Sequence, residues 1–467
     1  MRTSLLFVAV ALVCVALADL AVTTVDPWVE MARLGLGLVT PDFFATERLS
    51  RALINTVAFA LTGVALANVL GFALAFLFRY RAVRVGCAFV RAVHELFWAL
   101  IFLQVFGLGT VTGVLAIAIP YAGIIAKVYA EIIEEADTSP LKVIPAGTGW
   151  ASAKLFALIP EVWAHFKSYS LYRLECGLRS SAILGFVGLP TLGFHLESAF
   201  KQGHYSEVSA LLILFYVVIA TIRFWMRSKL APIYILLALW FLPGGTDIQW
   251  ANVVRFFTQD ILPYPIRAAE TFDAAALGAL WHWFADLFAH QALPGIVNTM
   301  ILTMIATVGA GCLTLVFFPL ISPLFFGRCG RTAGHVFLVV VRSTPEYILA
   351  YILLQLWGPS MLPAVIALAL HNGAIIGHLM GRFTEQLAQR PDRPTGINLY
   401  AYEVLPRIYP QFLAFLFYRW EVILRETAIL GILGIHTLGF FVDSAFADIR
   451  IDRALFLILL TAMLNIA

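Results

Sequence analysis

Apolar residues occur along the chain in long runs, and the polar residues are gathered in short segments between those runs. A run of about 20 apolar residues forms a helix that is long enough to cross the hydrocarbon core of a bilayer. The pattern predicts an all-α polytopic membrane protein with about 12 transmembrane helices. The predicted helices cover residues 4–22, 52–78, 86–106, 110–130, 161–183 and 208–226 in the first half, and 231–243, 295–325, 334–357, 360–380, 409–430 and 453–467 in the second.

The composition changes this picture little and excludes several other classes of protein. Hydrophobic residues make up 61% of the chain and charged residues 13%, whereas ordinary soluble proteins have about 25% charged residues. The net charge of +3 is too small to indicate a nucleic-acid partner. The five cysteines show no paired spacing, so we predict neither a disulfide framework nor a metal site.

Basic residues mark one side of the membrane. Arg79, Arg227, Arg328 and Arg382 follow the second, sixth, eighth and tenth predicted helices, and cytoplasmic loops carry an excess of Lys and Arg. We therefore assign these loops to the cytoplasm. Residues 1–22 have two interpretations, a cleaved signal peptide or a retained first helix, and the even helix count favours retention.

The second half of the chain repeats the first. Residues 171–200 align with 417–446 without a gap, with 17 identities in 30 positions. "RAVHELFWALIFLQVFG", from Arg91, aligns with "RSTPEYILAYILLQLWG", from Arg342, and "INT" at 54–56 resembles "VNT" at 297–299. We infer a first repeat at 1–229 and a second at 230–467. Six helices per repeat give both halves one orientation, related by a pseudo-two-fold axis along the membrane normal.

The repeated segment contains a glycine-rich phrase, "AILGFVGLPTLGF" in the first copy and "AILGILGIHTLGF" in the second. Its glycines are expected to break the helix. Inside a membrane a broken helix is tolerated where it is buried or lines a cavity, so we expect a gate or a re-entrant turn on the translocation path; close helix packing is the alternative. The candidate path residues are Glu175, Arg179, Gly185, Gly188, Thr191 and Gly193, with Glu421, Arg425, Gly431, Gly434, Thr437 and Gly439 in the second copy.

Charged residues inside apolar segments are candidates for function because they are costly there. Arg179 and Arg425, on symmetric helices, would suit an oxyanion, or would only neutralise the nearby glutamates. Two further candidate ion pairs join residues four apart, which share one face of a helix. These pairs are Arg91 with Glu95 and Arg342 with Glu346.

A long loop of mixed charge, about 131–160, is predicted to form two short helices around a glycine. Its "GTGWASAKLFALIP" places Gly147 thirteen residues before Pro160. This spacing resembles the coupling-loop motif of binding-protein-dependent ABC importer permeases. "LYRLECGLRSSAILGFVGLPTLG" and "ELFWALIFLQVFGLG" are similar to the phosphonate-type permeases of that group. The glutamate of the motif is replaced by Leu141.

The resemblance implies two coupling loops that bind ATPase subunits. The second loop, about 381–406, is shorter, and its Gly396 lies only ten residues before Pro406. The implied coupling residues are Glu134, Glu135, Gly147 and Pro160 in the first loop, and Glu385, Gly396 and Pro406 in the second.

The resemblance also implies a type I ABC importer fold, with two permease units fused in one chain of the bacterial inner membrane. Such a permease works by alternating access with two copies of an ABC ATPase and an extracellular or periplasmic solute-binding protein. ATP and Mg would be held by the ATPase, and the chain itself would be neither an enzyme nor a cofactor carrier. The expected substrate is phosphonate or a related phosphorus oxyanion. The alternative is an ion-gradient-driven secondary transporter with six-plus-six helices.

Overall fold

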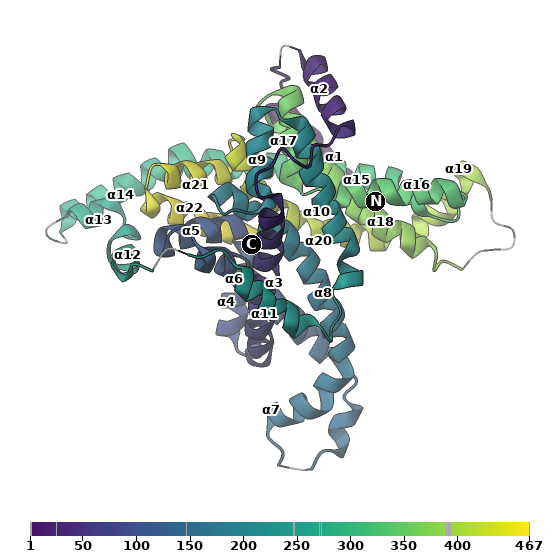
Figure 1. Ribbon diagram of the computed structural model, residues 1–467, viewed down its shortest axis with the longest axis horizontal. Helices are drawn as coiled ribbons and strands as arrows, with labels where there is room; N and C mark the ends of the chain where they lie inside the picture. The colour runs from purple at the N-terminus through teal and green to yellow at the C-terminus, as the bar shows by residue number, and fades with distance from the viewer. Residues whose placement is uncertain are drawn as a thin grey trace. The chain divides into compact units, whose positions relative to one another are not determined.

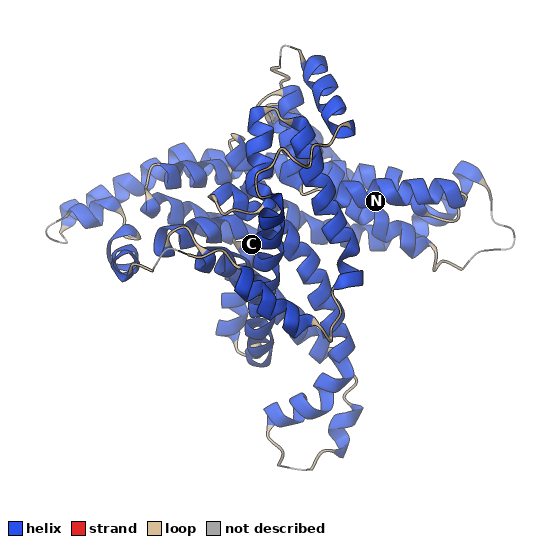
Figure 2. Ribbon diagram, in the orientation of Figure 1, coloured by secondary structure: helices blue, strands red, loops and turns tan. Residues whose placement is uncertain are grey.

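The computed structural model describes residues 2–466, except 25, 146, 246–247, 270, 272, 389, 391 and 393. Within these residues the chain forms helices and no strands (Figure 2). It divides into two compact units. Unit 1 comprises Met1–Ala32 and Pro263–Thr461, and unit 2 comprises Arg33–Leu262 and Ala462–Ala467.

Unit 2 is built around two long helices, α3 (Leu49–Leu77) and α6 (Thr110–Glu134), that pack along each other. A third long helix, α8 (Ile159–Ile183), packs on both of them. The shorter helices of this unit are α4 (Arg81–Ala92), α5 (Glu95–Phe106), α7 (Trp150–Ala153), α9 (Leu192–Gln202), α10 (Tyr205–Trp225), α11 (Ala231–Phe241) and α12 (Trp250–Arg255). The helix α2 (Pro27–Val39) crosses the boundary between the units.

Unit 1 contains helices of similar length in the same order. The long pair is α15 (Leu293–Ile321) and α18 (Met361–Thr384), and α20 (Leu405–Leu430) packs on both. The remaining helices are α1 (Arg2–Leu17), α13 (Tyr264–Ala268), α14 (Ala274–Leu287), α16 (Arg328–Ser343), α17 (Glu346–Trp357), α19 (Gly396–Asn398), α21 (Leu438–Ala447) and α22 (Ile451–Ile466).

The first helix of each sequence half packs on the long helix of the other half. α1 packs on α15, and α11 packs on α3. The segments that follow these two helices also contact residues of the other half of the sequence. Thr23 N donates a hydrogen bond to Trp357 O (2.9 Å), and the Thr110 hydroxyl donates to Pro243 O. The boundaries of the compact units, at 32/33, 262/263 and 461/462, therefore differ from the repeat boundary predicted at 229/230.

The helices are those of a multi-pass membrane protein. Among the described residues, five helices are long and apolar enough to span a bilayer, and this number rises to nine if each of four bent helix pairs is one span. Each of the twelve predicted segments coincides with a helix or a bent pair. α1, α11 and α22, with 16, 11 and 16 residues, are shorter than a typical span.

Two of the predicted single helices are wrong. Residues 86–106 and 334–357 were expected to form continuous spans. Instead α4 meets α5 at 94°, and α16 meets α17 at 91°. Arg81, Arg84 and Arg91 are spaced along α4 so that they share one face, and such an amphipathic helix is suited to a membrane surface.

Three π-helical turns in the described part of the chain lie just before a proline. In each case the residue before the proline donates its N–H to a carbonyl five residues earlier, as Ile159 does to Lys154 O. Proline lacks an N–H and interferes with the carbonyl four residues before it, so the wider turn lets the helix continue through the proline. The three prolines are Pro160, Pro294 and Pro406.

Candidate functional site

The glycine phrase breaks the helix in both units, as its glycines predicted. α8 ends in a short 3-10 turn, Leu184–Val187, and is bent by 57° from α9. α20 ends in the 3-10 turn Gly431–Leu433 and is bent by 46° from α21. Gly188 and Gly434 follow these turns with φ of 91° and 84°, a left-handed conformation that favours glycine.

The two arms of each break cross with almost no space between them. A Cβ added at Gly193 would overlap the carbonyl oxygen of Ala182, and a Cβ at Gly439 would overlap that of Ala428. Gly185 and Gly431 approach the backbone of the opposite arm in the same way. These four glycines are buried, as are Thr191 and Thr437. Close packing, the alternative considered from sequence, therefore describes these glycines.

A neighbouring Asn-Thr pair holds each turn in place. In unit 2, Asn55 Nδ2 donates to Pro190 O (2.8 Å), and Leu192 N donates to Thr56 Oγ1 (2.8 Å). In unit 1, Asn298 Nδ2 donates to His436 O (2.8 Å), and Leu438 N donates to the Thr299 hydroxyl (3.0 Å). These residues are the "INT" and "VNT" of the weakest sequence match, which therefore marked a structural contact.

In unit 2, a group of polar side chains joins the start of α5 to α6 and α8. The Ser180 hydroxyl donates to Glu95 Oε1 (2.7 Å) and is 2.9 Å from the Tyr121 hydroxyl. The Arg173 guanidinium lies over the Tyr121 ring, 5.6 Å from its centroid. Its Nε donates to the Tyr169 hydroxyl (2.8 Å). We call Glu95, Tyr121, Arg173 and Ser180 the unit 2 junction.

The corresponding junction in unit 1 has more charge. Arg419 donates to Asn372 Oδ1 (2.6 Å) and to Glu426 Oε1 (3.3 Å), and Asn372 Nδ2 donates to Glu426 Oε2 (3.1 Å). His371 Nε2 lies 3.8 Å from Glu346 Oε2, and its Nδ1 is 2.9 Å from Thr344 O. We call Glu346, His371, Asn372, Arg419 and Glu426 the unit 1 junction.

Three buried side chains of this junction have the chemistry of metal ligands. Their ligand atoms, from Glu346, His371 and Glu426, all lie within 4.8 Å of one another. Two carboxylates and an imidazole suit a divalent cation. Arg419, however, already supplies positive charge to Glu426. A cation here would compete with the guanidinium, and the ion pair by itself satisfies the carboxylate.

The two candidate ion pairs, Arg91 with Glu95 and Arg342 with Glu346, do not have the same-helix geometry that we predicted. Arg91 lies in the last turn of α4 and Glu95 begins α5, so the two residues do not share one helix face. Arg342 and Glu346 are separated by the equivalent bend. The glutamates begin their new helices, where a negative charge interacts favourably with the helix dipole.

The candidate oxyanion-binding arginines, Arg179 and Arg425, lie on α8 and α20 one turn after Glu175 and Glu421. All four side chains are half-buried. Arg179 Nη2 lies 3.6 Å from Cys176 Sγ.

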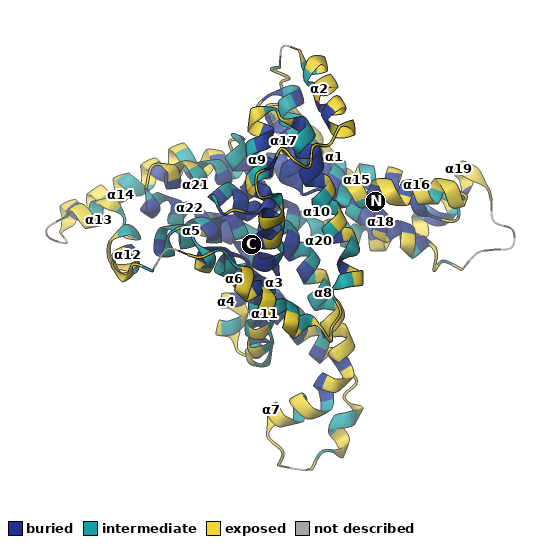
Figure 3. Ribbon diagram, viewed as in Figure 1, coloured by how far each residue is buried: buried dark blue, intermediate teal, exposed yellow. Residues whose placement is uncertain are grey.

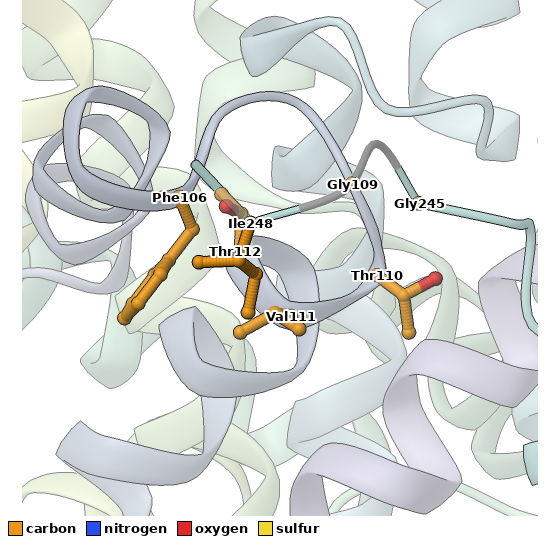
Figure 4. A pocket seen from close by; sticks show the side chains of 7 residues that line it. All are labelled: Phe106, Gly109, Thr110, Val111, Thr112, Gly245 and Ile248. Carbon is orange, nitrogen blue, oxygen red and sulfur yellow. The ribbon is translucent and has the colours of Figure 1, made fainter. Parts of the chain in front are cut away.

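A cavity of about 270 Å³ lies in unit 2 where α5 turns into α6 (Figure 4). Phe106, the segment from Gly109 to Thr112, Gly245 and Ile248 line it. None of the described residues that line this cavity has a charged side chain.

The first predicted coupling loop lies at the far end of α8, and α7 is exposed (Figures 1 and 3). It forms two short helical segments around Gly147, as expected, namely the 3-10 turn Ser139–Val143 and α7. Asp137 lies two residues before the first of these. It accepts hydrogen bonds from the Ser139 hydroxyl and N–H, which lower the pKa of its carboxyl group. Gly147 has a φ of 94°.

An aromatic side chain ties this loop to the end of α3. Arg79 and Lys154 lie over the Trp150 ring, 4.4 and 4.8 Å from its centroid. Phe76 packs edge-on against the same ring at 6.2 Å. A force on the loop would therefore be transmitted to α3 as well as to α8.

The second loop is also tied to its long helix. Tyr400 stacks on Phe318 of α15 with ring centroids 5.4 Å apart, and its hydroxyl donates to Leu315 O (3.1 Å). Leu399 and Val404 are buried in the same apolar cluster. Gly396 has a φ of 61°. Every implied coupling residue is exposed, namely Glu134, Glu135, Gly147, Pro160, Glu385, Gly396 and Pro406.

Sequence reasoning missed most of the junction residues. Arg173 and Arg419 were aligned as identical between the repeats, and this was a usable signal. Ser180 and Glu426 also occupy aligned positions but differ in type, so the comparison of repeats alone could not identify them.

Several known transport proteins are similar to this chain. The phosphate-import permease protein PhnE of Mycolicibacterium smegmatis is 26% identical over 449 residues, which cover 89% of this chain and 83% of that protein. The phosphite transport system permease protein PtxC of Stutzerimonas stutzeri is 31% identical over 224 residues, covering 45% of this chain and 81% of that protein. A putative cryptic phosphonate transport system permease protein of Escherichia coli is 31% identical over 111 residues, 24% of this chain and 91% of that protein.

The coverage shows that this chain is about 1.7 times as long as the phosphite permease, since most of that protein matches less than half of the chain. No family model matches the chain. No solved structure matches it either.

Proposed function

Because the chain belongs to the family of phosphonate-, phosphite- and phosphate-type transport permeases, we propose that it is the membrane subunit of an ATP-driven importer for a phosphorus oxyanion. It is a transport protein and not an enzyme. The observation that carries the proposal is the match to a phosphite permease over 81% of that protein's length. Duplicated glycine turns and two exposed loops are the features through which the import would work.

We propose further that the chain is two permease units in tandem, residues 1–229 and 230–467, with six helices each. A shorter relative, 81% of which matches only 45% of this chain, supports this proposal, as do the matching bends of α4–α5 and α16–α17. Six helices in each of these two permease units would give both permease units the same orientation, related by a pseudo-two-fold axis along the membrane normal.

The partners follow from the same proposal. Two copies of an ABC ATPase, each holding ATP and Mg, would bind the two coupling loops, and a solute-binding protein would deliver substrate on the opposite side of a bacterial inner membrane. Closure of the ATPases would push on the loops. Trp150 and Tyr400 would pass that movement to α3 and α15, the helices whose Asn-Thr pairs hold the glycine turns.

The coupling role of the first loop can be tested at Gly147. An aspartate at Gly147 would have to adopt a φ of 94° in an exposed turn, a conformation that costs an ordinary side chain about 1–2 kcal/mol. We expect Gly147→Asp to lower recovery of the ATPase with the purified chain at least ten-fold, measured by co-purification. ATP-dependent uptake into proteoliposomes should fall with it.

Gly149→Asp is the matched control, because Gly149 lies in the same loop with an ordinary φ of −57° and open space around it. Equal loss in both variants would mean that charge in the loop, and not its conformation, governs binding. Uptake that needs no ATPase and collapses with an uncoupler would contradict the importer and favour the ion-gradient alternative.

The substrate role of Arg179 and Arg425 is tested by uptake. If both guanidiniums bind the oxyanion, Arg179→Ala and Arg425→Ala should each raise the substrate concentration needed for half-maximal uptake about ten-fold or more, since one charge-assisted hydrogen bond is worth roughly 1.5–3 kcal/mol. Phosphonate, phosphite and phosphate should be compared in the same assay. Unchanged uptake in both variants would remove these arginines from the substrate path and leave the family assignment intact.

A further inference from the structure

Four basic side chains gather between α16 and α18 in unit 1, and none of them is a member of the unit 1 junction or of the glycine turn. The rings of His335 and His378 face each other with centroids 5.3 Å apart. Arg342 and Arg382 interact electrostatically with both imidazoles. We call these four residues the α16–α18 basic cluster.

Helix spacing explains why the four side chains meet. His335 and Arg342 are seven residues apart on α16, and His378 and Arg382 are four apart on α18. Both spacings place side chains on one helix face. The two faces oppose each other because α16 packs on α18.

We call His378, which is buried, the floor of the cluster, and His335 and Arg382, which are exposed, its rim. His378 is only 5% exposed, and its Nε2 makes no hydrogen bond within the part of the chain that the structure describes. His335 and Arg382 are exposed, and Arg342 is half-buried. A buried imidazole nitrogen without a partner is costly, and a ligand that reached it would remove this cost.

Unit 2 differs at the aligned positions. When the alignment of Arg91 with Arg342 is extended without a gap, His378 corresponds to Lys127 and Arg382 corresponds to Glu131. Lys127 and Glu131 form an ion pair of their own, with Nζ 3.6 Å from Oε1. A carboxylate thus stands in unit 2 where the cluster has a guanidinium. The carboxylate nearest to the cluster along α18 is Glu385, at the end of the helix.

We propose that the α16–α18 basic cluster binds a phosphate group. Guanidiniums bind the oxygens of a phosphate through paired hydrogen bonds, and an imidazole can donate one more from the floor. The phosphate could belong to an anionic lipid headgroup or be free inorganic phosphate. A groove of about 730 Å³ along α16, lined largely by apolar atoms of residues from Arg328 to Phe337, would give a lipid chain a place beside the cluster.

The experiment uses the full chain, purified in detergent and freed of lipid. Inorganic phosphate is titrated at constant ionic strength, with chloride as the reference anion, and thermal unfolding reports binding because a ligand stabilises the folded state. In a second arm the chain is reconstituted in vesicles of phosphatidylcholine with or without phosphatidylglycerol. The lipid that stays bound on re-extraction is then identified by mass spectrometry.

The variant His335→Gln/Arg382→Gln removes the rim, and His378→Gln tests the floor. The matched control is Arg84→Gln/Lys127→Gln, which removes the two basic side chains that unit 2 has at the positions aligned with His335 and His378. We expect the rim variant to bind at least ten-fold more weakly and the control to bind like the wild type. Phosphate bound in the translocation path would persist in the rim variant, so a failure here is separable from a failure of the transport proposal.

Saturable stabilisation by inorganic phosphate that the rim variant loses would support the proposal with free phosphate as the ligand. Selective retention of phosphatidylglycerol that the rim variant loses would support it with a lipid headgroup. If neither ligand distinguishes the rim variant from the wild type, or if the control loses as much as the rim variant, the proposal is wrong.

Discussion

Replacing Gly193 by alanine is expected to abolish uptake and to destabilise the protein by about 2–3 kcal/mol, the upper range for overpacking a tight interior. The added Cβ would overlap Ala182 O, and the other atoms nearest to it are also Ala182 backbone. Backbone at the end of a helix cannot rotate away as a side chain can. The α9 arm would have to move, and the hydrogen bond from Leu192 to Thr56 would be lost with it.

Thermal unfolding and uptake should be measured together on this variant. The control is Gly86→Ala, on α4, where an added Cβ would meet nothing within 4 Å. Alanine should be neutral or slightly stabilising there, because it favours a helix more than glycine does. A Gly193→Ala protein that is as stable and active as the control would show that the two arms are not locked together.

Replacing Arg419 by methionine is expected to cost about 3–5 kcal/mol, the usual penalty for removing one partner of a buried ion pair. Glu426 would lose its positively charged partner while another carboxylate, Glu346, stays in the same junction. Thermal unfolding in detergent should show the loss directly.

Unit 2 provides the matched comparison. Arg173→Met removes the aligned arginine, whose partners are tyrosines, so the expected cost is smaller, about 1–2 kcal/mol for lost cation–π contacts. The double variant Arg419→Met/Glu426→Ser places serine where unit 2 has Ser180 and should recover most of the loss. If Arg419→Met is no worse than Arg173→Met, the ion pair does not stabilise unit 1.

The sequence predicted most helices to within a few residues, because apolar runs long enough to span a bilayer rarely form anything else. The prediction of 52–78 corresponds to α3, Leu49–Leu77, and that of 409–430 to α20, Leu405–Leu430. It failed at the two sharp bends, because an apolar run does not record a change of direction. Pro345 was a usable signal for one bend. The other has no proline and is capped by His94, whose Nδ1 accepts from Leu96 N (3.2 Å).

The glycine turns were predictable because the glycines that break each helix lie next to one another in the sequence, and no contact with a distant residue has to be known. The junctions were not predictable in this way. Ser180 bonds Glu95 across 85 positions, and Arg419 bonds Asn372 across 47. Such pairs depend on how helices pack, and neither residue type by itself indicates a partner at that distance.

The packing of α1 on α15 has a consequence for how the protein is made. Leu293, where α15 begins, is synthesised 276 residues (293 − 17) after Leu17, where α1 ends. At about 5–20 residues per second, the ribosome needs roughly 15–55 seconds for that stretch. During this time α1 has no α15 to pack on. It contains no charged residue after Arg2, and a helix that is apolar on every side tolerates lipid all around it for as long as the wait lasts.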